Sequence, residues 1–321
     1  MRLLVTGGAG FIGSNYVRRI IDGHLKGVSN LIVLDKLTYA GTLSNLDSAP
    51  KDSFQFIQGD ICDESLVSRL VERVDSIINF AAESHVDRSI SDPGRFIETN
   101  VKGTQTLLSA IKSGSDKKFV QISTDEVYGS IETGTWDENC PLLPNSPYSA
   151  SKAAADLITR SYFKTFGLNI NITRSSNNYG PHQFPEKVIP LFITNLIDEN
   201  KVPLYGSGLN VRDWLHVDDH CRGIHDVLMK GRAGEIYNIG GGEELTNKEL
   251  TKLILNAFNK SDENIEFVPD RLGHDLRYSV DCGKISSELG YKPQVQFKVG
   301  IQETIKWYRD NESWWRPLKK L

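Results

Sequence analysis

The chain has 321 residues, 39% of them hydrophobic and 24% charged, which is the composition of a globular protein with one large core or two smaller ones. Its 37 basic and 41 acidic residues give a net charge of -4, and the scattered basic residues argue against nucleic acid or an anionic membrane as partner. The first apolar run stops at Thr6, so we expect neither a signal peptide nor a membrane span. The four cysteines form no Cys-x-x-Cys pair, which favours a reducing cytoplasm and indicates neither disulfides nor zinc.

The first half of the chain alternates short β-branched runs with longer amphipathic stretches. Strands are expected at 3–5, 31–34, 54–57, 77–80 and 119–122. Apolar strands of this kind are buried on both faces, and right-handed helical crossovers join them into a doubly wound parallel sheet. The sequence therefore predicts an α/β protein of the Rossmann class.

After about Asn178 the rhythm breaks, because prolines crowd together and short strand-like pieces interrupt the helices. We expect a first domain over 1–178, which binds a dinucleotide and has later returns near 210–240. Residues 179–321 would form mainly a smaller α/β region that binds substrate. Residues 170–173 and 235–238 look like further sheet strands, and Thr246 with Glu249 resembles a capping box that opens a helix.

A glycine-rich turn follows the first expected strand and precedes an apolar helix. Gly7 would allow the tight turn, Gly10 the close approach of a pyrophosphate, and Gly13 the packing of the helix on the sheet. Asp35 ends the second strand about 20 residues further on, where a carboxylate accepts from ribose hydroxyls and repels a 2′-phosphate. This favours NAD over NADP. The alternative is that Asp35 is simply a turn residue at the end of the strand.

Further cofactor contacts are expected where other strands end and along the glycine-rich turn. Residues after the third and fourth strands would form part of the wall of the cofactor site. The alternative is that they only pack in the core. The expected set beyond the three glycines and Asp35 is Phe11, Ile12, Lys36, Thr38, Asp60, Ile61, Phe80, Ala81, Ala82, Thr99, Tyr148, Lys152 and Asn178.

Tyr148 and Lys152 are four residues apart, which places a phenol and an ammonium on one helix face. A nearby cation lowers the pKa of a phenol, while desolvation opposes this effect. Tyr148 is therefore a candidate base near neutrality. A surface Tyr/Lys pair is the alternative. With the glycine-rich turn, and with Ser123-Thr124 ending an intervening strand, the chain resembles the extended short-chain dehydrogenase/reductase family. That resemblance implies that Thr124, Tyr148 and Lys152 form an oxidising triad.

Asp125 and Glu126 follow Thr124 directly and would supply a separate acid and base after oxidation. A solvent-facing acidic pair is the alternative. Together with segments 84–89, 177–181, 212–214 and 270–278, the triplet resembles the nucleotide-sugar 4,6-dehydratases within the family. The resemblance implies dTDP-glucose as substrate, Asp125 as acid for the C6 hydroxyl, Glu126 as base at C5, and Thr124 near the C4 oxygen.

The same resemblance implies a substrate pocket that draws on both halves of the chain. Arg212 and Arg271 are the expected diphosphate contacts, since guanidinium groups bind phosphate bidentately. The other expected contacts are Ser84, Thr124, Asn177, Lys187, Pro203, Tyr205, Asn247, His274 and Tyr278.

Three further patterns allow a structural interpretation. The segment His216 to His220 invites a metal site, but we expect Asp218 to cap the following helix and no metal to bind. The aromatic residues at 307, 308, 314 and 315 are expected to pack on the core. Helical stretches 93–113 and 151–166 are apolar on more than one face, and relatives pair such helices in a homodimer.

Two rival functions stay open. One is a different reaction in the same family, either a nucleotide-sugar epimerase, which has no use for Asp125 and Glu126, or a dehydratase for another nucleotide. Thymine and uracil differ by one methyl group, which is worth only about 1 to 3 kcal/mol in an apolar pocket. The other is a non-catalytic NAD sensor, which would not need Tyr148 and Lys152.

Overall fold

The computed structural model describes residues 1–113 and 117–319, and its largest element is a parallel sheet of seven strands. The strands are β1 (Arg2–Thr6), β2 (Asn30–Asp35), β3 (Gln55–Gln58), β4 (Ser76–Asn79), β5 (Lys118–Thr124), β6 (Ile170–Ser175) and β10 (Ile236–Ile239). They are ordered β10-β6-β5-β4-β1-β2-β3, and every neighbouring pair is parallel. The predicted doubly wound α/β fold is confirmed, and the strands expected near 170 and 235 both lie in this sheet.

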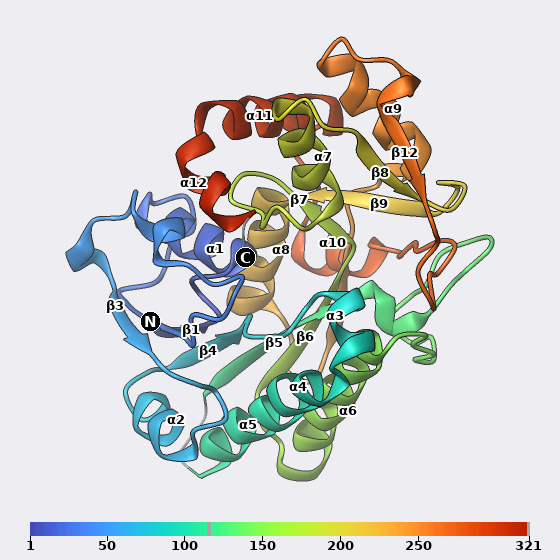
Figure 1. Cartoon of the computed structure of the whole chain (residues 1–321). Coiled ribbons are helices and arrows are strands. Elements are labelled where there is room, and N and C mark those ends of the chain that lie inside the picture. Colours follow the sequence, from blue (N-terminus) through green and yellow to red (C-terminus); the bar gives the residue numbers. More distant parts are fainter. Residues whose placement is uncertain (114–116, 320–321) are drawn as a thin grey trace.

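Helices cover both faces of the sheet (Figure 1). They are α1 (Phe11–Ile21) and α8 (Val217–Lys230) on one face, and α2 (Glu64–Val71), α5 (Thr104–Lys112) and α6 (Pro147–Phe166) on the other. Side chains of a strand alternate between the two faces. Leu3 and Val5 accordingly belong to the core under α1 and α8, whereas Leu4 belongs to the opposite core.

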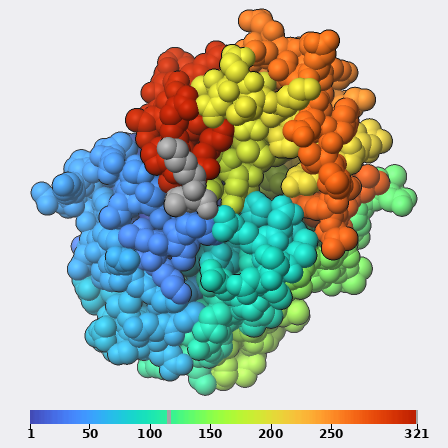
Figure 2. Space-filling model, in the orientation of Figure 1, coloured from blue at the N-terminus to red at the C-terminus, as the bar shows by residue number. Residues whose placement is uncertain are grey.

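A second lobe lies beyond the carboxyl edge of the sheet, and it holds most of the C-terminal segments (Figures 1 and 2). Its strands form a three-stranded sheet β11-β9-β7 and a two-stranded sheet β12-β8. They are β7 (Asn177–Tyr179), β8 (Val202–Tyr205), β9 (Val211–His216), β11 (Glu244–Thr246) and β12 (Ile265–Val268). Its helices are α7 (Val188–Ile197), α9 (Asn247–Ala257), α11 (Phe297–Asp310) and α12 (Glu312–Leu318). Helix α10 (Gly283–Leu289) instead packs on β10 and α8.

The lobe has its own apolar core between α7, α9, α11 and the strands. Tyr308 and Trp315 are fully buried in it, and Trp307 and Trp314 pack against it. The expectation that the aromatic C-terminal segment packs on a core is therefore confirmed. The predicted capping box is also present, because Thr246 and Glu249 cap α9 reciprocally.

The stretch expected to be helical from Pro93 contains three consecutive segments. These are α4 (Pro93–Phe96), a π-helical segment η3 (Ile97–Gly103) and α5. Short helix α3 (Val86–Ser91) precedes them, and η3 packs beside α6. Among the described residues, no helix is both long and apolar enough to cross a membrane.

Candidate active site

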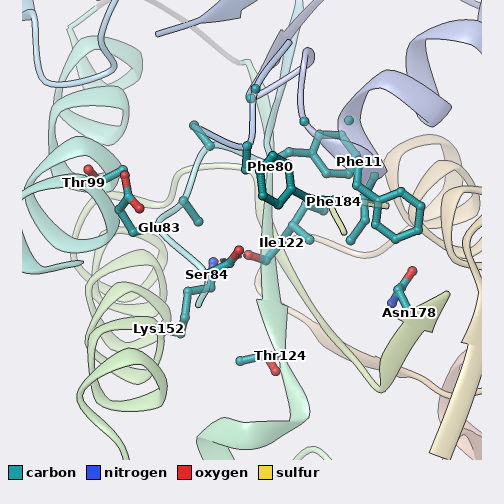
Figure 3. A pocket seen from close by; sticks show the side chains of 18 of the residues that line it. Phe11, Phe80, Glu83, Ser84, Thr99, Ile122, Thr124, Lys152, Asn178 and Phe184 are labelled. Atoms are coloured by element: carbon teal, nitrogen blue, oxygen red, sulfur yellow. Dashed lines mark hydrogen bonds between the residues drawn. The ribbon is translucent and has the colours of Figure 1, made fainter. Parts of the chain in front are cut away.

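A deep pocket lies at the carboxyl ends of β1, β2, β4, β5 and β6, where a doubly wound sheet binds its ligand (Figure 3). Loops after these strands form its floor, and the segment before α7 closes it from the second lobe. It is lined by Gly7, Gly10, Phe11, Ile12, Gly13, Leu34, Asp35, Lys36, Thr38, Ala40, Gly41, Gly59, Ile61, Phe80, Ala81, Ala82, Glu83, Ser84, Thr99, Ile122, Ser123, Thr124, Asp125, Glu126, Tyr148, Lys152, Ser175, Ser176, Asn177, Asn178, Gln183, Phe184, Glu186 and Lys187.

The glycine-rich turn has the geometry that its spacing predicted. Gly7 has a φ of 68°, in the left-handed region, and a Cβ there would lie 2.7 Å from Cα of Ala81. A Cβ on Gly13 would overlap the carbonyl oxygen of Gly7. Gly10 caps α1 without any side chain, so the first N–H groups of this helix point toward the pocket unscreened. This end of α1 is suited to a phosphate group.

Asp35 ends β2 and is buried, with 8% of its surface exposed. One carboxylate oxygen accepts from the backbone N–H of Leu37 at 2.8 Å and the other from Ala9 at 2.9 Å. The carboxylate therefore shapes the turn after β2, as the alternative interpretation proposed, and also lines the pocket. Burial raises its pKa, against the effect of both backbone bonds.

Of the residues expected to contact the cofactor, all but Asp60 line this pocket. Asp60 points to Lys36 instead, with 2.6 Å between its carboxylate and the Lys36 ammonium. Figure 3 shows the rings of Phe11, Phe80 and Phe184 gathered at one end and Lys152 and Thr124 at the other. The pocket thus has an apolar aromatic end and a polar end.

The acidic pair is fixed by a tight turn at the end of β5. Thr124 caps a 3₁₀ turn over Asp125–Tyr128, and its hydroxyl accepts from the N–H of Glu126 at 3.3 Å. Gly129 ends the turn at a φ of 83°. Asp125 is only 2% exposed, so the interpretation of the pair as solvent-facing is wrong.

The two carboxyl groups have different electrostatic surroundings. Burial, followed by the charges of Glu126 and Asp213, raises the pKa of Asp125 well above its ordinary value. One Asp125 oxygen also has no hydrogen-bond partner, which favours the protonated form. Burial raises the pKa of Glu126 as well, but three cations lower it, namely Arg271, Arg212 and Lys187.

Tyr148 and Lys152 lie in the first turns of α6, whose start the sequence determines. Ser146 caps the helix by accepting from Ser149 N–H at 3.1 Å, and Pro147 occupies the first helical position. Both functional side chains are consequently buried beside the carboxylates at the end of β5.

Burial dominates the pKa of Tyr148, so the expected effect of the nearby Lys152 cation does not determine it. Burial, then the charge of Glu126, raises the pKa of Tyr148, and the neighbouring Thr124 side chain opposes the rise. The Lys152 ammonium donates to the carbonyl of Ile122 at 2.6 Å, and burial lowers its pKa to about 8 against the charge of Asp156. Desolvation outweighs the attraction that the spacing alone suggested.

The expected substrate residues fall into two groups. Ser84, Thr124, Asn177 and Lys187 line the pocket. Lys187 reaches across from the second lobe, and its ammonium donates to the carbonyl of Ser84 at 3.0 Å. An oxygen of the Asn177 side chain is buried without a partner and is free to bind a ligand.

The remaining expected residues stand in the second lobe outside the pocket lining. Arg212 is 4% exposed, stacks on the Tyr278 ring at 4.3 Å and donates to the carbonyl of Asp275 at 2.9 Å. Tyr205 packs edge-on against His274, whose imidazole lies 2.6 Å from Asp270. The others in this group are Pro203 on β8, Asn247 at the start of α9, and Arg271.

Several lining residues were not anticipated. Ser175 ends β6, Ser176 follows it, and Glu83 lies in the loop after β4. The rule that ligands bind at strand carboxyl ends would have found these residues. Gln183, Phe184 and Glu186 come from an irregular segment whose sequence carries no such signal.

The segment His216 to His220 has structural contacts. His216, not Asp218, caps α8, because its ring nitrogen accepts from Asp218 N–H at 3.2 Å, so the predicted cap is wrong. Asp218 pairs instead with Arg19 at 2.9 Å. His220 pairs with Asn178 at 2.8 Å. These side chains point to different partners.

A Rossmann sheet with a buried Tyr/Lys pair and an acidic pair is typical of enzymes that modify sugars with the help of NAD. Comparison with known proteins gives the same class. The family model described as GDP-mannose 4,6 dehydratase matches residues 4–304, and the chain belongs to this family. It is 57% identical over 323 residues to the dTDP-glucose 4,6-dehydratase of Streptomyces antibioticus, covering 100% of this chain and 96% of that one.

Solved structures give the same result. A dTDP-glucose 4,6-dehydratase from Streptomyces venezuelae, solved with NAD bound, has a TM-score of 0.98 and 56% identity, covering 99% of this chain and 100% of that one. A UDP-glucose 4-epimerase from Thermotoga maritima has a TM-score of 0.89 at 30% identity, covering 97% and 100%. The fold is therefore shared with epimerases, and the sites must distinguish the reactions.

Proposed function

We propose that this protein is a lyase that converts dTDP-glucose to dTDP-4-keto-6-deoxyglucose. It uses NAD that is regenerated within each cycle. The observation that carries the proposal is the acidic pair beside Tyr148 and Lys152 in the pocket, in which Asp125 is buried and Glu126 is half-buried. Full-length identity of 57% to a dTDP-glucose 4,6-dehydratase supports it.

NAD supplies a hydride acceptor for C4 and a donor for C6. The residues that would hold it fit the group, because Gly10 leaves the start of α1 open to a pyrophosphate and Asp35 is placed for ribose hydroxyls. Tyr148 removes the proton of the C4 hydroxyl, with Thr124 as its hydrogen-bond partner and Lys152 as the nearby cation. Since burial raises the Tyr148 pKa, substrate and cofactor charge must offset this rise during turnover.

Water is lost through the acidic pair. A ketone at C4 makes the C5 proton acidic, and Glu126 removes it, since three cations favour its charged form. Asp125 holds a proton because it is buried between carboxylates, and it donates this proton to the departing C6 hydroxyl. The charges around the two carboxyl groups thus differ in the direction that the elimination needs, with carboxylates near Asp125 and cations near Glu126.

The nucleotide diphosphate would bind toward the second lobe. Arg212 and Arg271 supply its cations, and both lie close enough to Glu126 to affect its pKa. Accordingly, we place the cofactor in the domain of residues 1–178, with returns near 210–240, and most of the nucleotide-sugar contacts in 179–321.

Incubation of the purified protein with dTDP-glucose, without added reductant, tests the proposal by mass analysis of the nucleotide sugar. Loss of one water is expected. An unchanged mass with conversion to the 4-epimer would identify an epimerase, and no change with any nucleotide sugar would favour an NAD sensor. A parallel reaction with UDP-glucose measures the base preference.

A homodimer and a cytoplasmic location complete the proposal. Ile97 on η3 and Leu157 on the adjacent α6 are 59% and 56% exposed, as expected for helices that pair with a second copy. A monomer mass in light scattering at working concentration would contradict the dimer. The four cysteines are free thiols, in keeping with a reducing compartment.

A further inference from the structure

The loop that follows β2 forms one wall of the dinucleotide end of the pocket. Lys36, Thr38, Ala40 and Gly41 all line the pocket from this loop. Its far end is anchored at Asn45, which is 2% exposed, donates to the carbonyl of Ala9 at 2.8 Å and accepts from Trp314 at 3.1 Å. Residues 36–41 therefore form the stretch of the wall between the end of β2 and this anchor.

Tyr39, in the middle of this wall, reaches across to the segment before α7. Its hydroxyl donates to a carboxylate oxygen of Glu186 at 3.0 Å. Its ring packs edge-on against Phe184, with 5.4 Å between ring centroids. Burial, then the charge of Glu186, raises the pKa of Tyr39, so the hydroxyl stays protonated and remains a donor. Phe184 and Glu186 line the same pocket from the opposite side.

Arg88 joins the same contact from a third segment. Its guanidinium lies over the Tyr39 ring at 3.7 Å from the centroid. Its Nε donates to the second oxygen of Glu186 at 3.3 Å. One carboxylate thus holds together the β2 loop, helix α3 and the segment before α7.

We propose that Tyr39, Arg88 and Glu186 form a latch that keeps residues 36–41 closed over the bound dinucleotide and so retains it from one turnover to the next. This rests on the proposed function, in which NAD returns to its starting form in every cycle and has no reason to leave. The three side chains are positioning residues, because they act on the wall of the pocket and not on the reacting atoms.

The molecule contains a matched control with the same chemistry outside the pocket lining. Glu288 accepts from the Tyr237 hydroxyl at 3.0 Å and from Arg232 at 2.7 Å. Lys284 lies over the Tyr237 ring at 5.0 Å. Tyr237→Phe and Glu288→Gln therefore remove equivalent interactions without touching the latch.

The test is the rate at which NAD leaves the holoprotein, followed after dilution into an enzyme that destroys free NAD. Tyr39→Phe and Glu186→Gln should each release NAD about tenfold faster than the unaltered protein, because a hydrogen bond to a charged group is lost or weakened. Tyr237→Phe and Glu288→Gln should release it at the unaltered rate. The double variant Tyr39→Phe with Glu186→Gln should fall short of the product of the single effects, since both act on one contact.

The proposal would be overturned if Tyr39→Phe and Glu186→Gln released NAD at rates within about twofold of the two control variants. It would also be overturned if NAD release were faster to the same extent in all four variants. Activity with saturating NAD should be retained in Tyr39→Phe. A protein that holds NAD but does not dehydrate dTDP-glucose would refute the proposed function while leaving the release rates interpretable. A protein that binds no dinucleotide would refute both.

Discussion

The two ends of the pocket are built in different ways. The dinucleotide end relies on backbone placed by Gly7 and Gly13 and on Asp35, all within one early stretch of chain. The polar end holds Glu126, whose pKa is raised by burial and lowered by the charges of Arg271 and Arg212. These two arginines lie outside the pocket lining and are far from Glu126 in the sequence. Shape determines recognition at the first end, and converging side chains determine chemistry at the second. Substitutions at the first end should therefore affect NAD binding, and substitutions at the second end should affect the reaction with the sugar.

The largest effect should come from the acidic pair. Glu126→Gln should lower turnover of dTDP-glucose by about 10² to 10⁴-fold, because the base at C5 is lost, while oxidation at C4 continues. Reduced cofactor should then accumulate, which its absorbance would report. Glu132→Gln, an exposed glutamate nearby, serves as the control. Full turnover by Glu126→Gln would refute the role assigned to it.

The next effect tests the dinucleotide end. Gly13→Ala should abolish NAD retention and destabilise the protein by roughly 3 kcal/mol, because the new Cβ meets backbone that cannot yield. Gly94→Ala, whose Cβ would have its nearest neighbour at 3.7 Å, should leave both properties unchanged. Thermal unfolding and bound-NAD content measure the two effects, and normal NAD content in Gly13→Ala would contradict the close packing of α1.

A smaller effect should separate the two ends. Arg212→Lys loses the stack on Tyr278 and the planar donor set, so we expect KM for dTDP-glucose to rise by about 10-fold to 100-fold. NAD release should not change, because Arg212 lies outside the dinucleotide end. Steady-state kinetics and the release assay check both parts, and a parallel loss of NAD would show that the ends are coupled.

The smallest effect concerns stability and pH. Burial lowers the Lys152 pKa from 10.5 to about 8, so the folded protein holds fewer protons than the unfolded chain between these values. The buried charge is unfavourable below about pH 8, and this penalty is relieved as the pH rises toward 10.5. The shift corresponds to roughly 3 kcal/mol, part of which is offset in Lys152→Met by the lost hydrogen bond to Ile122. Lys152→Met should thus be more stable by about 1 to 2 kcal/mol at pH 7, although inactive. Urea unfolding should show this gain shrinking above pH 8, and a gain that is constant with pH would contradict the assignment.

The sheet and the dinucleotide end were largely predictable because their signals are local. The strands, the glycine-rich turn and Asp35 each depend on neighbouring residues and on the rule for strand carboxyl ends. Predictions that needed the environment of a group were less accurate. The spacing of Tyr148 and Lys152 suggested a lowered tyrosine pKa, but burial raises it. Aspartate is a favourable residue for a helix N-cap, but His216 and not Asp218 occupies the N-cap position of α8.

By itself, the sequence determined the α/β fold and the glycine-rich turn, because patterns within a few residues specify them. It also named candidate residues for oxidation and elimination, through the family resemblance of their motifs. Only the tertiary structure decided the different environments of Asp125 and Glu126, since their neighbours Asp213, Arg212 and Arg271 come from the second lobe. It also decided the contact of Tyr39 with Glu186, which no spacing indicates. Charge and burial act through space, and folding alone brings these residues together.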